Sequence, residues 1–197
     1  MRREKTMGAD TGSLDNPGSN EAPYAKRTIA LVGLMGAGKS TVGRRLADRL
    51  GRKFYDSDVE IEKAAGLSIS DIFSIHGEAE FRRGERKVLA RLLEDEPHVL
   101  ATGGGAYLDP DTRTMLRDRA ITVWLNADLE TIWKRVSRRD TRPLLRAPDP
   151  KGVLTRLFEE REPIYSQADL SVASVDGPHN ETVVAIIKAL EGWTGHA

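Results

Sequence analysis

One stretch near the beginning of the chain constrains its fold more than any other. The apolar run Thr28–Val32 leads directly into Gly33-Leu34-Met35-Gly36-Ala37-Gly38-Lys39-Ser40, and a helical pattern follows from Thr41 to Leu50. The spacing G-x-x-x-x-G-K-S is the P-loop pattern, which joins a strand to the N-terminus of a helix. The chain is therefore expected to contain a buried strand and a helix that together hold phosphate groups.

The residue types in this stretch suit phosphate binding. The small residues Gly36-Ala37-Gly38 allow successive backbone N–H groups to point toward phosphate oxygens, and the helix that follows adds its N-terminal dipole. The ammonium group of Lys39 is expected to reach the β- and γ-phosphates, and the hydroxyl of Ser40 to bind Mg²⁺. The pattern predicts a nucleoside-triphosphate site. A glycine-rich turn with an incidental lysine is the alternative, which the flanking strand and helix disfavour.

Beyond this stretch, short apolar runs alternate with longer helical patterns, which is typical of a parallel α/β sheet. The expected strands are Thr28–Val32, Lys53–Tyr55, His98–Ala101, Ile121–Leu125 and Leu170–Val172. The expected helices are Lys39–Leu50, Val59–Ala65, Asp71–Ile75 with Ser70 as its cap, Glu78–Leu93 after a break at Gly77, Asp109–Asp118, Asp128–Ser137, Lys151–Tyr165, and a last helix from its cap Asn180 to Trp193. The predicted fold is α/β, a five-stranded parallel sheet flanked by helices on both faces.

The composition limits the class of protein. A chain of 197 residues has the size of one domain with a substantial core. Its 30 basic and 30 acidic residues give no overall charge that would favour nucleic acid or an anionic membrane. No apolar run approaches the length of a membrane span. The absence of cysteine excludes disulfides, thiolate metal sites and a cysteine nucleophile, and it fits a reducing compartment such as the cytoplasm.

Two segments differ from the rest of the chain. Residues 1–26 are rich in Gly, Asp, Asn, Ser and Pro and lack apolar periodicity, so we expect a disordered N-terminal tail ahead of a domain that spans residues 27–197. A targeting segment is the alternative, which the acidic residues of the tail disfavour. Residues 138–150 form a polar stretch of arginines and prolines, for which a mobile lid and a simple disordered loop are both open.

Candidate site residues gather where the expected strands end, because ligands of an open parallel sheet bind beyond the carboxyl ends of its strands. Asp56-Ser57-Asp58 follows the second strand, and Thr102-Gly103-Gly104-Gly105 follows the third. The third strand lacks the acid that usually ends it in nucleotide hydrolases, so Ser40 and Asp56 are expected to bind the metal. Asp58 is expected to hold a substrate hydroxyl. A helix N-cap with one spare surface acid is the alternative for the two aspartates.

Three arginines stand in short segments suited to anion binding. Arg82 ends the segment Gly77–Arg82, Arg142 begins Arg142–Leu145, and Arg161 begins Arg161–Tyr165. A guanidinium group can bind a carboxylate or a phosphate with two parallel hydrogen bonds. Together with the P-loop, the paired aspartates and the triple glycine, these segments occur in the order and spacing of the shikimate kinases. The chain resembles that family from about residue 28 to residue 190.

The resemblance implies a P-loop kinase with substrate-binding helices and a mobile lid, which transfers the γ-phosphoryl group of ATP to the 3-hydroxyl of shikimate with Mg²⁺ as its metal. It implies that Asp58 holds the ring hydroxyls and is the candidate base, and that Arg82 and Arg161 clamp the shikimate carboxylate. Glu85 would orient Arg82, and Arg142 on the lid would cover ATP. Together, the pattern and the resemblance give Lys39, Asp58 and Arg142 as the expected catalytic residues. The expected substrate residues are Asp58, Arg82, Glu85, Gly103, Gly104, Gly105 and Arg161, and the expected metal ligands are Ser40 and Asp56. The expected nucleotide residues are Gly36, Ala37, Gly38, Lys39, Ser40, Thr41 and Arg142, to which Arg135 is added from its place in the sequence and not from the resemblance.

Several points stay open in the sequence. The turn Val175–His179 has no arginine where some family members hold adenine, so Arg135 is the expected contact. Another small-metabolite kinase, for gluconate or a nucleoside monophosphate, is an alternative activity. A P-loop binding module without catalysis is a further alternative, although the Asn-Lys-x-Asp motif of guanine switches does not occur. The expected partners are ATP and shikimate, without nucleic acid or membrane, and the expected state is a monomer.

Overall fold

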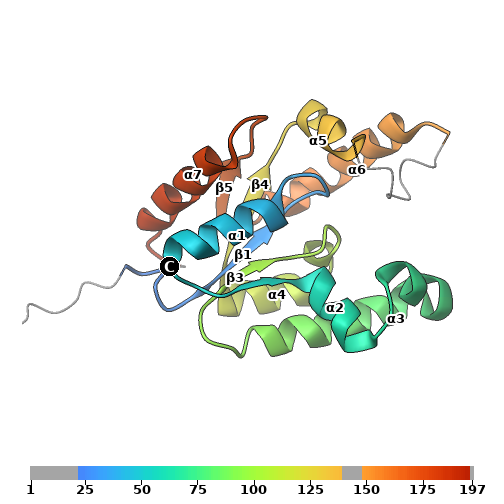
Figure 1. The fold of residues 1–197 in the computed structure, drawn as a ribbon, viewed down its shortest axis with the longest axis horizontal. Helices are drawn as coiled ribbons and strands as arrows, with labels where there is room; N and C mark the ends of the chain where they lie inside the picture. The colour runs from blue at the N-terminus through green and yellow to red at the C-terminus, as the bar shows by residue number, and fades with distance from the viewer. Residues whose placement is uncertain (1–21, 139–147, 196–197) are drawn as a thin grey trace, which may run out of the picture.

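The computed structural model describes residues 22–138 and 148–195, which form one parallel sheet with helices around it (Figure 1). The strands pair in the order β2-β3-β1-β4-β5, and every pair is parallel. The expected five-stranded α/β fold is confirmed, and each strand lies close to its predicted bounds. The strands are β1 (Thr28–Val32), β2 (Phe54–Asp56), β3 (Val99–Ala101), β4 (Ala120–Asn126) and β5 (Leu170–Ala173).

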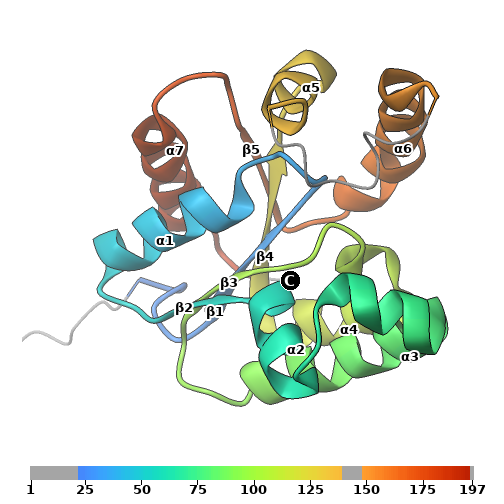
Figure 2. The same ribbon diagram turned by 45° about the vertical axis from the view of Figure 1, so that its right-hand side comes forward.

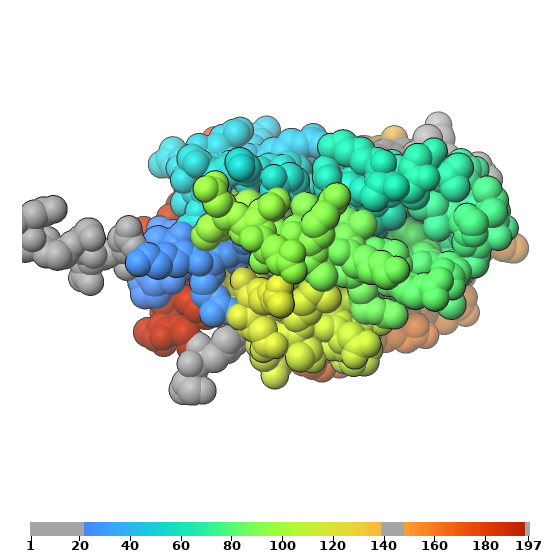
Figure 3. Space-filling model, turned by 90° about the horizontal axis from the view of Figure 1, so that it is seen from below, coloured from blue at the N-terminus to red at the C-terminus, as the bar shows by residue number. Residues whose placement is uncertain are grey.

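The helices form a layer on each face of the sheet. They are α1 (Lys39–Leu50), α2 (Ser57–Ala65), α3 (Ile69–Leu92), α4 (Pro110–Arg119), α5 (Leu129–Val136), α6 (Pro150–Tyr165) and α7 (His179–Glu191), with a short 3₁₀ turn η1 (Ala106–Leu108). Helices α1 and α7 cover one face, and α3 and α4 cover the other, which is the face seen from below in Figure 3. Helix α5 and the start of α6 lie beyond the end at which β1 and β4 finish (Figures 1 and 2).

The central strand β1 is buried along its whole length, because β3 and β4 pair with its two edges and helices cover the sheet. Its side chains Ile29 and Leu31 are fully buried. Gly43 lets α1 approach β2 closely, since a Cβ atom there would lie 2.6 Å from a ring carbon of Phe54. This packing fixes α1, and the loop that precedes it, against the sheet.

Helix α3 corrects one detail of the prediction and confirms another. Its cap is Ser68 and not Ser70: the Ser68 hydroxyl accepts a hydrogen bond from the N–H of Asp71 at 3.1 Å and donates to the Asp71 carboxylate at 2.6 Å. This reciprocal pair starts the helix earlier and leaves Ser70 inside it. Gly77 has φ of 78° and ψ of 173°, so the predicted break is present, as a kink between the two helical parts.

Helix α7 begins two residues earlier than predicted. His179 is its first residue, and Pro178 occupies the N-cap position without a side-chain cap. The prediction that Asn180 caps this helix is therefore wrong. The proline ring holds its own φ at −58°, which turns the chain into the helix before Asn180 is reached.

The chain just ahead of β1 is tied to the domain. Residues 23–26 form a turn, and the guanidinium group of Arg52 donates to the carbonyl oxygens of Tyr24, Ala25 and Arg27 at 2.8 to 3.0 Å. Residues 1–21 of the predicted tail lie outside the described residues, as do residues 139–147 of the predicted lid. Within the described ranges, no helix is both long enough and apolar enough to cross a membrane.

Candidate active site

The predicted P-loop joins the end of β1 to the start of α1. Gly33, Gly36 and Gly38 have φ values of 133°, 82° and 100°, a backbone conformation that residues with side chains rarely adopt. Gly36 is also confined, because a Cβ atom there would lie 2.8 Å from a methyl carbon of Val136 on α5. The glycine spacing of the motif is therefore what this backbone requires. Ala37 is buried inside the loop.

Lys39 lies at the N-terminus of α1, with Ser40 and Thr41 in the same first turn. Its ammonium group donates to the carbonyl oxygens of Gly33 at 2.7 Å and Leu34 at 3.0 Å, so the side chain folds back over the loop and is only 8% exposed. A positive charge and the N-terminal dipole of α1 thus meet at one place, which favours the binding of an anion there.

Asp56 connects the P-loop with the end of β2. Its Oδ2 accepts a hydrogen bond from the Ser40 hydroxyl at 2.6 Å, and its Oδ1 accepts the N–H of Asp58 at 3.2 Å and so caps α2. The alternative of a helix cap is thus correct for Asp56, but the same carboxylate also faces the P-loop. Among the described residues, no group of three or more acidic or histidine side chains is arranged to hold a metal ion by itself. Two hard oxygens fit Mg²⁺, which commonly keeps water and phosphate as its other ligands.

Asp58 lies half-buried between the P-loop and the glycine loop that follows β3. A Cβ atom at Gly103 would lie 2.5 Å from Oδ1 of Asp58 and 3.1 Å from Oε1 of Glu85, so both carboxylates face this loop. Burial raises the pKa of Asp58, and the nearby charge of Asp56 raises it further, whereas Lys39 opposes the rise. The site therefore makes Asp58 a better proton acceptor than an exposed aspartate.

Arg82 and Glu85 form an ion pair on α3. The Arg82 Nη1 donates to Oε2 of Glu85 at 2.6 Å, and Glu85 is only 1% exposed. Burial raises the pKa of Glu85, while its hydrogen bond to Arg82 lowers it. The other oxygen of Glu85 is buried and has no partner among the described residues. The buried carboxylate holds one edge of the guanidinium group, as the resemblance implied, and Arg82 stays half-buried beside the glycine loop.

The triple glycine makes room for protein groups, which the sequence did not reveal. A Cβ atom at Gly105 would overlap the guanidinium group of Arg82, and one at Gly104 would lie 3.3 Å from the backbone nitrogen of Met35 in the P-loop. The N–H of Gly103 donates to the Ser57 hydroxyl at 2.9 Å. The loop thus fits between the P-loop and α3 because it has no side chains.

Arg161 lies half-buried on α6, one turn before Tyr165. The Tyr165 hydroxyl donates a hydrogen bond to the carbonyl oxygen of Gly104. Burial raises the pKa of Tyr165, and the positive charges of Arg161 and Arg82 oppose that rise. The two arginines predicted to clamp a carboxylate therefore come together near one hydroxyl. The sequence placed Tyr165 at the end of the segment Arg161–Tyr165 but predicted no role for it.

Arg135 bridges the P-loop and the turn after β5. Its guanidinium group donates to the carbonyl oxygens of Ala37 at 3.2 Å and Val175 at 2.6 Å, and to the Ser174 hydroxyl at 3.1 Å. This position, next to the phosphate loop, is compatible with the expected contact to a nucleotide. Arg142, the other predicted nucleotide residue of this region, lies outside the described residues.

A comparison with known families decides what kind of protein carries this site. Residues 35–191 match the family model for shikimate kinase. The chain belongs to the shikimate kinase family. A shikimate kinase of Caulobacter vibrioides is 56% identical over 169 residues, which cover 86% of this chain and 84% of that protein. The resemblance stated from the sequence is confirmed, and with it membership of a family of ATP-dependent kinases.

Solved structures agree with this family assignment. A shikimate kinase from Acinetobacter baumannii in complex with shikimate has a TM-score of 0.79 and 40% identity, and the match covers 84% of this chain and 93% of that one. A gluconokinase from Sinorhizobium meliloti has a TM-score of 0.56 and 20% identity, over 84% of this chain and 92% of that one. At that identity the gluconokinase shares the fold alone.

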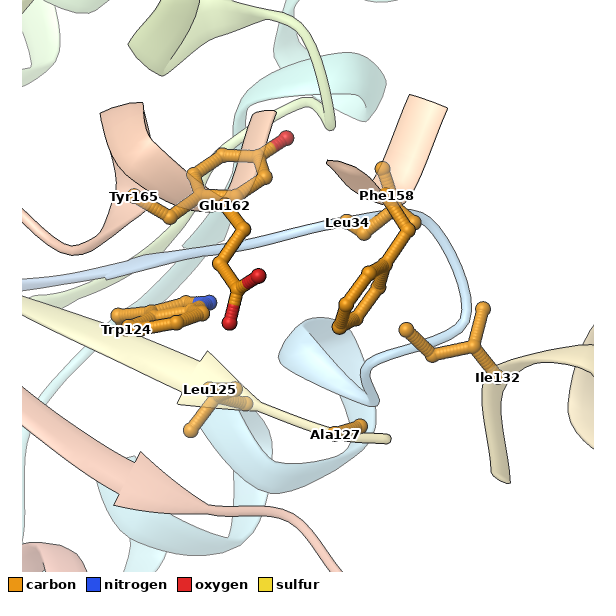
Figure 4. Close-up of a pocket in the computed structure, with 8 residues that line it drawn as sticks. All are labelled: Leu34, Trp124, Leu125, Ala127, Ile132, Phe158, Glu162 and Tyr165. Carbon is orange, nitrogen blue, oxygen red and sulfur yellow. The ribbon is translucent and has the colours of Figure 1, made fainter. Parts of the chain in front are cut away.

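In this shikimate kinase family member, an apolar hollow lies beside the P-loop (Figure 4). None of the predicted site residues lines it. The carboxylate of Glu162 faces the indole nitrogen of Trp124, and the Tyr165 hydroxyl points away from Trp124. The hollow is lined by Leu34, Trp124, Leu125, Ala127, Ile132, Phe158, Glu162 and Tyr165. The ring of Tyr165 thus separates this hollow from the glycine loop.

Proposed function

We propose that the chain transfers the γ-phosphoryl group of ATP to the 3-hydroxyl of shikimate, giving shikimate 3-phosphate and ADP. The observation that carries the proposal is the convergence of Asp58, Arg82 and Glu85 on the loop Gly103–Gly105, beside the P-loop, in a member of the shikimate kinase family. The related Acinetobacter structure contains shikimate, which supports this choice of acceptor.

The P-loop and its neighbours would hold the phosphoryl donor. The backbone N–H groups of residues 36–41 would bind phosphate oxygens, and Lys39 would neutralise charge on the β- and γ-phosphates. Ser40 and Asp56, whose oxygens lie 2.6 Å apart, would hold Mg²⁺, which supplies positive charge to the phosphate oxygens. Arg135 would contact the nucleotide, and Arg142 would cover it.

The glycine loop and the arginines around it would hold the acceptor. Arg82 and Arg161 would bind the carboxylate, and the buried charge of Glu85 keeps Arg82 in place for this purpose. The backbone of residues 103–105 would contact the ring. An acceptor that is fixed both at its carboxylate and at its hydroxyls presents one particular oxygen to the γ-phosphate, and such orientation is the main requirement of phosphoryl transfer.

Asp58 would take the proton from the attacking hydroxyl. Its raised pKa favours proton uptake, and the positive charges of Lys39 and Arg82 limit that rise, which favours the ionised form that a base requires. The same carboxylate would hold the neighbouring ring hydroxyls. We also propose that the protein acts as a cytoplasmic monomer, with one domain at residues 27–197 after an N-terminal tail and with residues 138–150 as a lid that excludes water.

An ADP-release assay tests the proposed activity. ADP should form with ATP, Mg²⁺ and shikimate together, and not when gluconate or a nucleoside monophosphate replaces shikimate. ADP release that is indifferent to shikimate would refute the proposal, and stimulation by gluconate alone would favour the alternative kinase. Stoichiometric ATP binding without turnover would favour a non-catalytic binding module.

Asp58→Asn tests the role of the base. The amide cannot accept the proton, so kcat should fall about a thousandfold, whereas the KM for ATP should change little. Asp48→Asn on the exposed side of α1 makes the same chemical change away from the site and should retain wild-type turnover. Near-normal kcat in Asp58→Asn would show that the base lies elsewhere.

A further inference from the structure

Tyr165 has a buried hydroxyl at the junction of two parts of the acceptor site. The residue is 2% exposed and ends α6, the helix that also carries Arg161. Its hydroxyl donates to the carbonyl oxygen of Gly104, in the middle of the triple glycine. A residue 61 positions away in the sequence is thus linked to the loop by a single side-chain hydrogen bond.

The ring of Tyr165 is held independently of this hydroxyl. It stacks against Tyr107 and against Trp124, and each pair of ring centroids lies 6.4 Å apart. Figure 4 shows the hydroxyl on the side of the ring that points away from Trp124. Because packing fixes the ring, the hydroxyl can be removed while the aromatic contacts remain.

Two cationic groups lie near the same hydroxyl. The charges of Arg161 and Arg82 both act on Tyr165 and oppose the effect of burial on its pKa. Arg82 is fixed by Glu85 and fills the space that a side chain on Gly105 would need. The hydroxyl therefore stands among the glycine loop, α6 and α3, the three elements that carry the proposed acceptor contacts.

The hydrogen bond from Tyr165 determines the orientation of one amide of the glycine loop. A peptide unit is planar, so a fixed carbonyl oxygen at Gly104 also fixes the N–H of Gly105, which points to the opposite side. The carbonyl oxygens of Gly103 and Gly105 accept the N–H groups of Ala106 and Leu108 at 3.1 Å, whereas the carbonyl oxygen of Gly104 is held by Tyr165. In the described part of the chain, no protein group accepts the N–H of Gly104 or Gly105. Both amides remain available to a ligand, and the orientation of the Gly105 N–H depends on Tyr165.

We infer that Tyr165 is a positioning residue for the acceptor: through its hydroxyl it holds the middle of the triple-glycine loop against α6, so that the N–H of Gly105 and the guanidinium group of Arg161 face the acceptor together. The inference rests on the proposed function, because it concerns the acceptor site. According to this inference, Tyr165 affects the binding of the acceptor and not the binding of ATP. The P-loop, and therefore the KM for ATP, should not depend on this hydroxyl.

Tyr165→Phe tests the inference, with Tyr107→Phe as the matched control. Tyr107 belongs to the same aromatic stack, but its hydroxyl interacts with Thr122 on β4 and not with the glycine loop. Loss of the hydroxyl at residue 165 leaves the buried carbonyl of Gly104 without its partner, so the KM for shikimate should rise about tenfold. The KM for ATP should not change in either variant, and Tyr107→Phe should keep the wild-type KM for shikimate.

Two measurements separate positioning from general stability. Thermal unfolding should show a comparable loss of stability in the two phenylalanine variants, whereas only Tyr165→Phe should raise the KM for shikimate. In a double-mutant cycle, the effects of Tyr165→Phe and Arg161→Lys on the KM for shikimate should be non-additive, because both substitutions disturb the same placement of the glycine loop against α6. An unchanged KM for shikimate in Tyr165→Phe, or an equal rise in Tyr107→Phe, would overturn the inference while the wild-type activity stands. A wild-type protein that does not use shikimate would overturn the proposed function and this inference together.

Discussion

Replacing Gly103 by alanine should disable catalysis without unfolding the protein. A Cβ atom at this position would lie 2.5 Å from Oδ1 of Asp58 and 3.1 Å from Oε1 of Glu85. Non-bonded heavy atoms in favourable contact are about 3.5 Å apart, so the Asp58 carboxylate must move by about 1 Å. The φ angle of Gly103 is not positive, so alanine does not require a left-handed backbone there and the perturbation comes from the contacts with Asp58 and Glu85.

The displacement sets the expected size of the effect. A misplacement of about 1 Å in a reacting group costs about a hundredfold in rate, which corresponds to about 2.7 kcal/mol of lost transition-state stabilisation. We therefore expect kcat with shikimate to fall about a hundredfold in Gly103→Ala. The KM for ATP should stay near the wild-type value, because the atoms nearest to the new methyl group belong to Asp58 and Glu85 and not to the P-loop.

Steady-state ADP release with both substrates varied measures these parameters, and thermal unfolding confirms that the variant is folded. Gly84→Ala is the matched control: it lies inside α3, and a Cβ atom there would meet nothing within 4 Å. It should keep full activity and gain up to about 1 kcal/mol of stability from helix propensity. Wild-type kcat in Gly103→Ala, or an equal loss in Gly84→Ala, would refute the steric reasoning.

Further predictions concern the arginine clamp and one buried histidine. Arg82→Lys should raise the KM for shikimate about tenfold or more, because one ammonium group cannot both pair with Glu85 and bind a carboxylate through two parallel hydrogen bonds. Arg83→Lys, at the exposed neighbouring position, should leave the KM for shikimate unchanged. Steady-state kinetics of both variants would show whether the clamp depends on the guanidinium group of Arg82. Burial lowers the pKa of His98, whose Nε2 has no partner among the described residues. Below about pH 6.5 the unfolded chain therefore binds a proton that the folded chain excludes, and the free energy of unfolding should fall until the pH passes the folded pKa. Urea unfolding between pH 8 and pH 5 measures this fall, which should be smaller in His98→Asn; an equal fall in that variant would place its origin in other groups.

The sequence predicted those parts of the fold that depend on neighbouring residues. The apolar run Thr28–Val32, the glycine spacing of the P-loop and the periodicity of Lys39–Leu50 indicate structure within a few residues, and all three elements are present with those bounds. Helix starts were less predictable. Ser68 and Ser70 are both suitable caps for α3, and only the hydrogen bonds of Ser68 with Asp71 distinguish them.

The residues proposed for the acceptor site could be named as a set only because their order resembles a family. Composition and spacing could not have paired Arg82 with Arg161, since arginines are common on surfaces. The structure brings both near Tyr165. The signal that could have identified Tyr165 is its place one turn after Arg161, which puts both side chains on one side of α6.

The sequence by itself determined that this chain has a phosphate-binding loop between a strand and a helix, because that information lies within a dozen consecutive residues. Only the tertiary structure decided what the triple glycine is for. The strand order β2-β3-β1 places the ends of three strands side by side, so that Gly103 meets Asp58 and Gly104 meets Met35, and the packing of α3 brings Arg82 against Gly105. These contacts join residues that lie 23 to 69 positions apart in the sequence, so no local pattern can specify them. Because of this packing, a side chain in the glycine loop would displace the groups proposed to bind the acceptor.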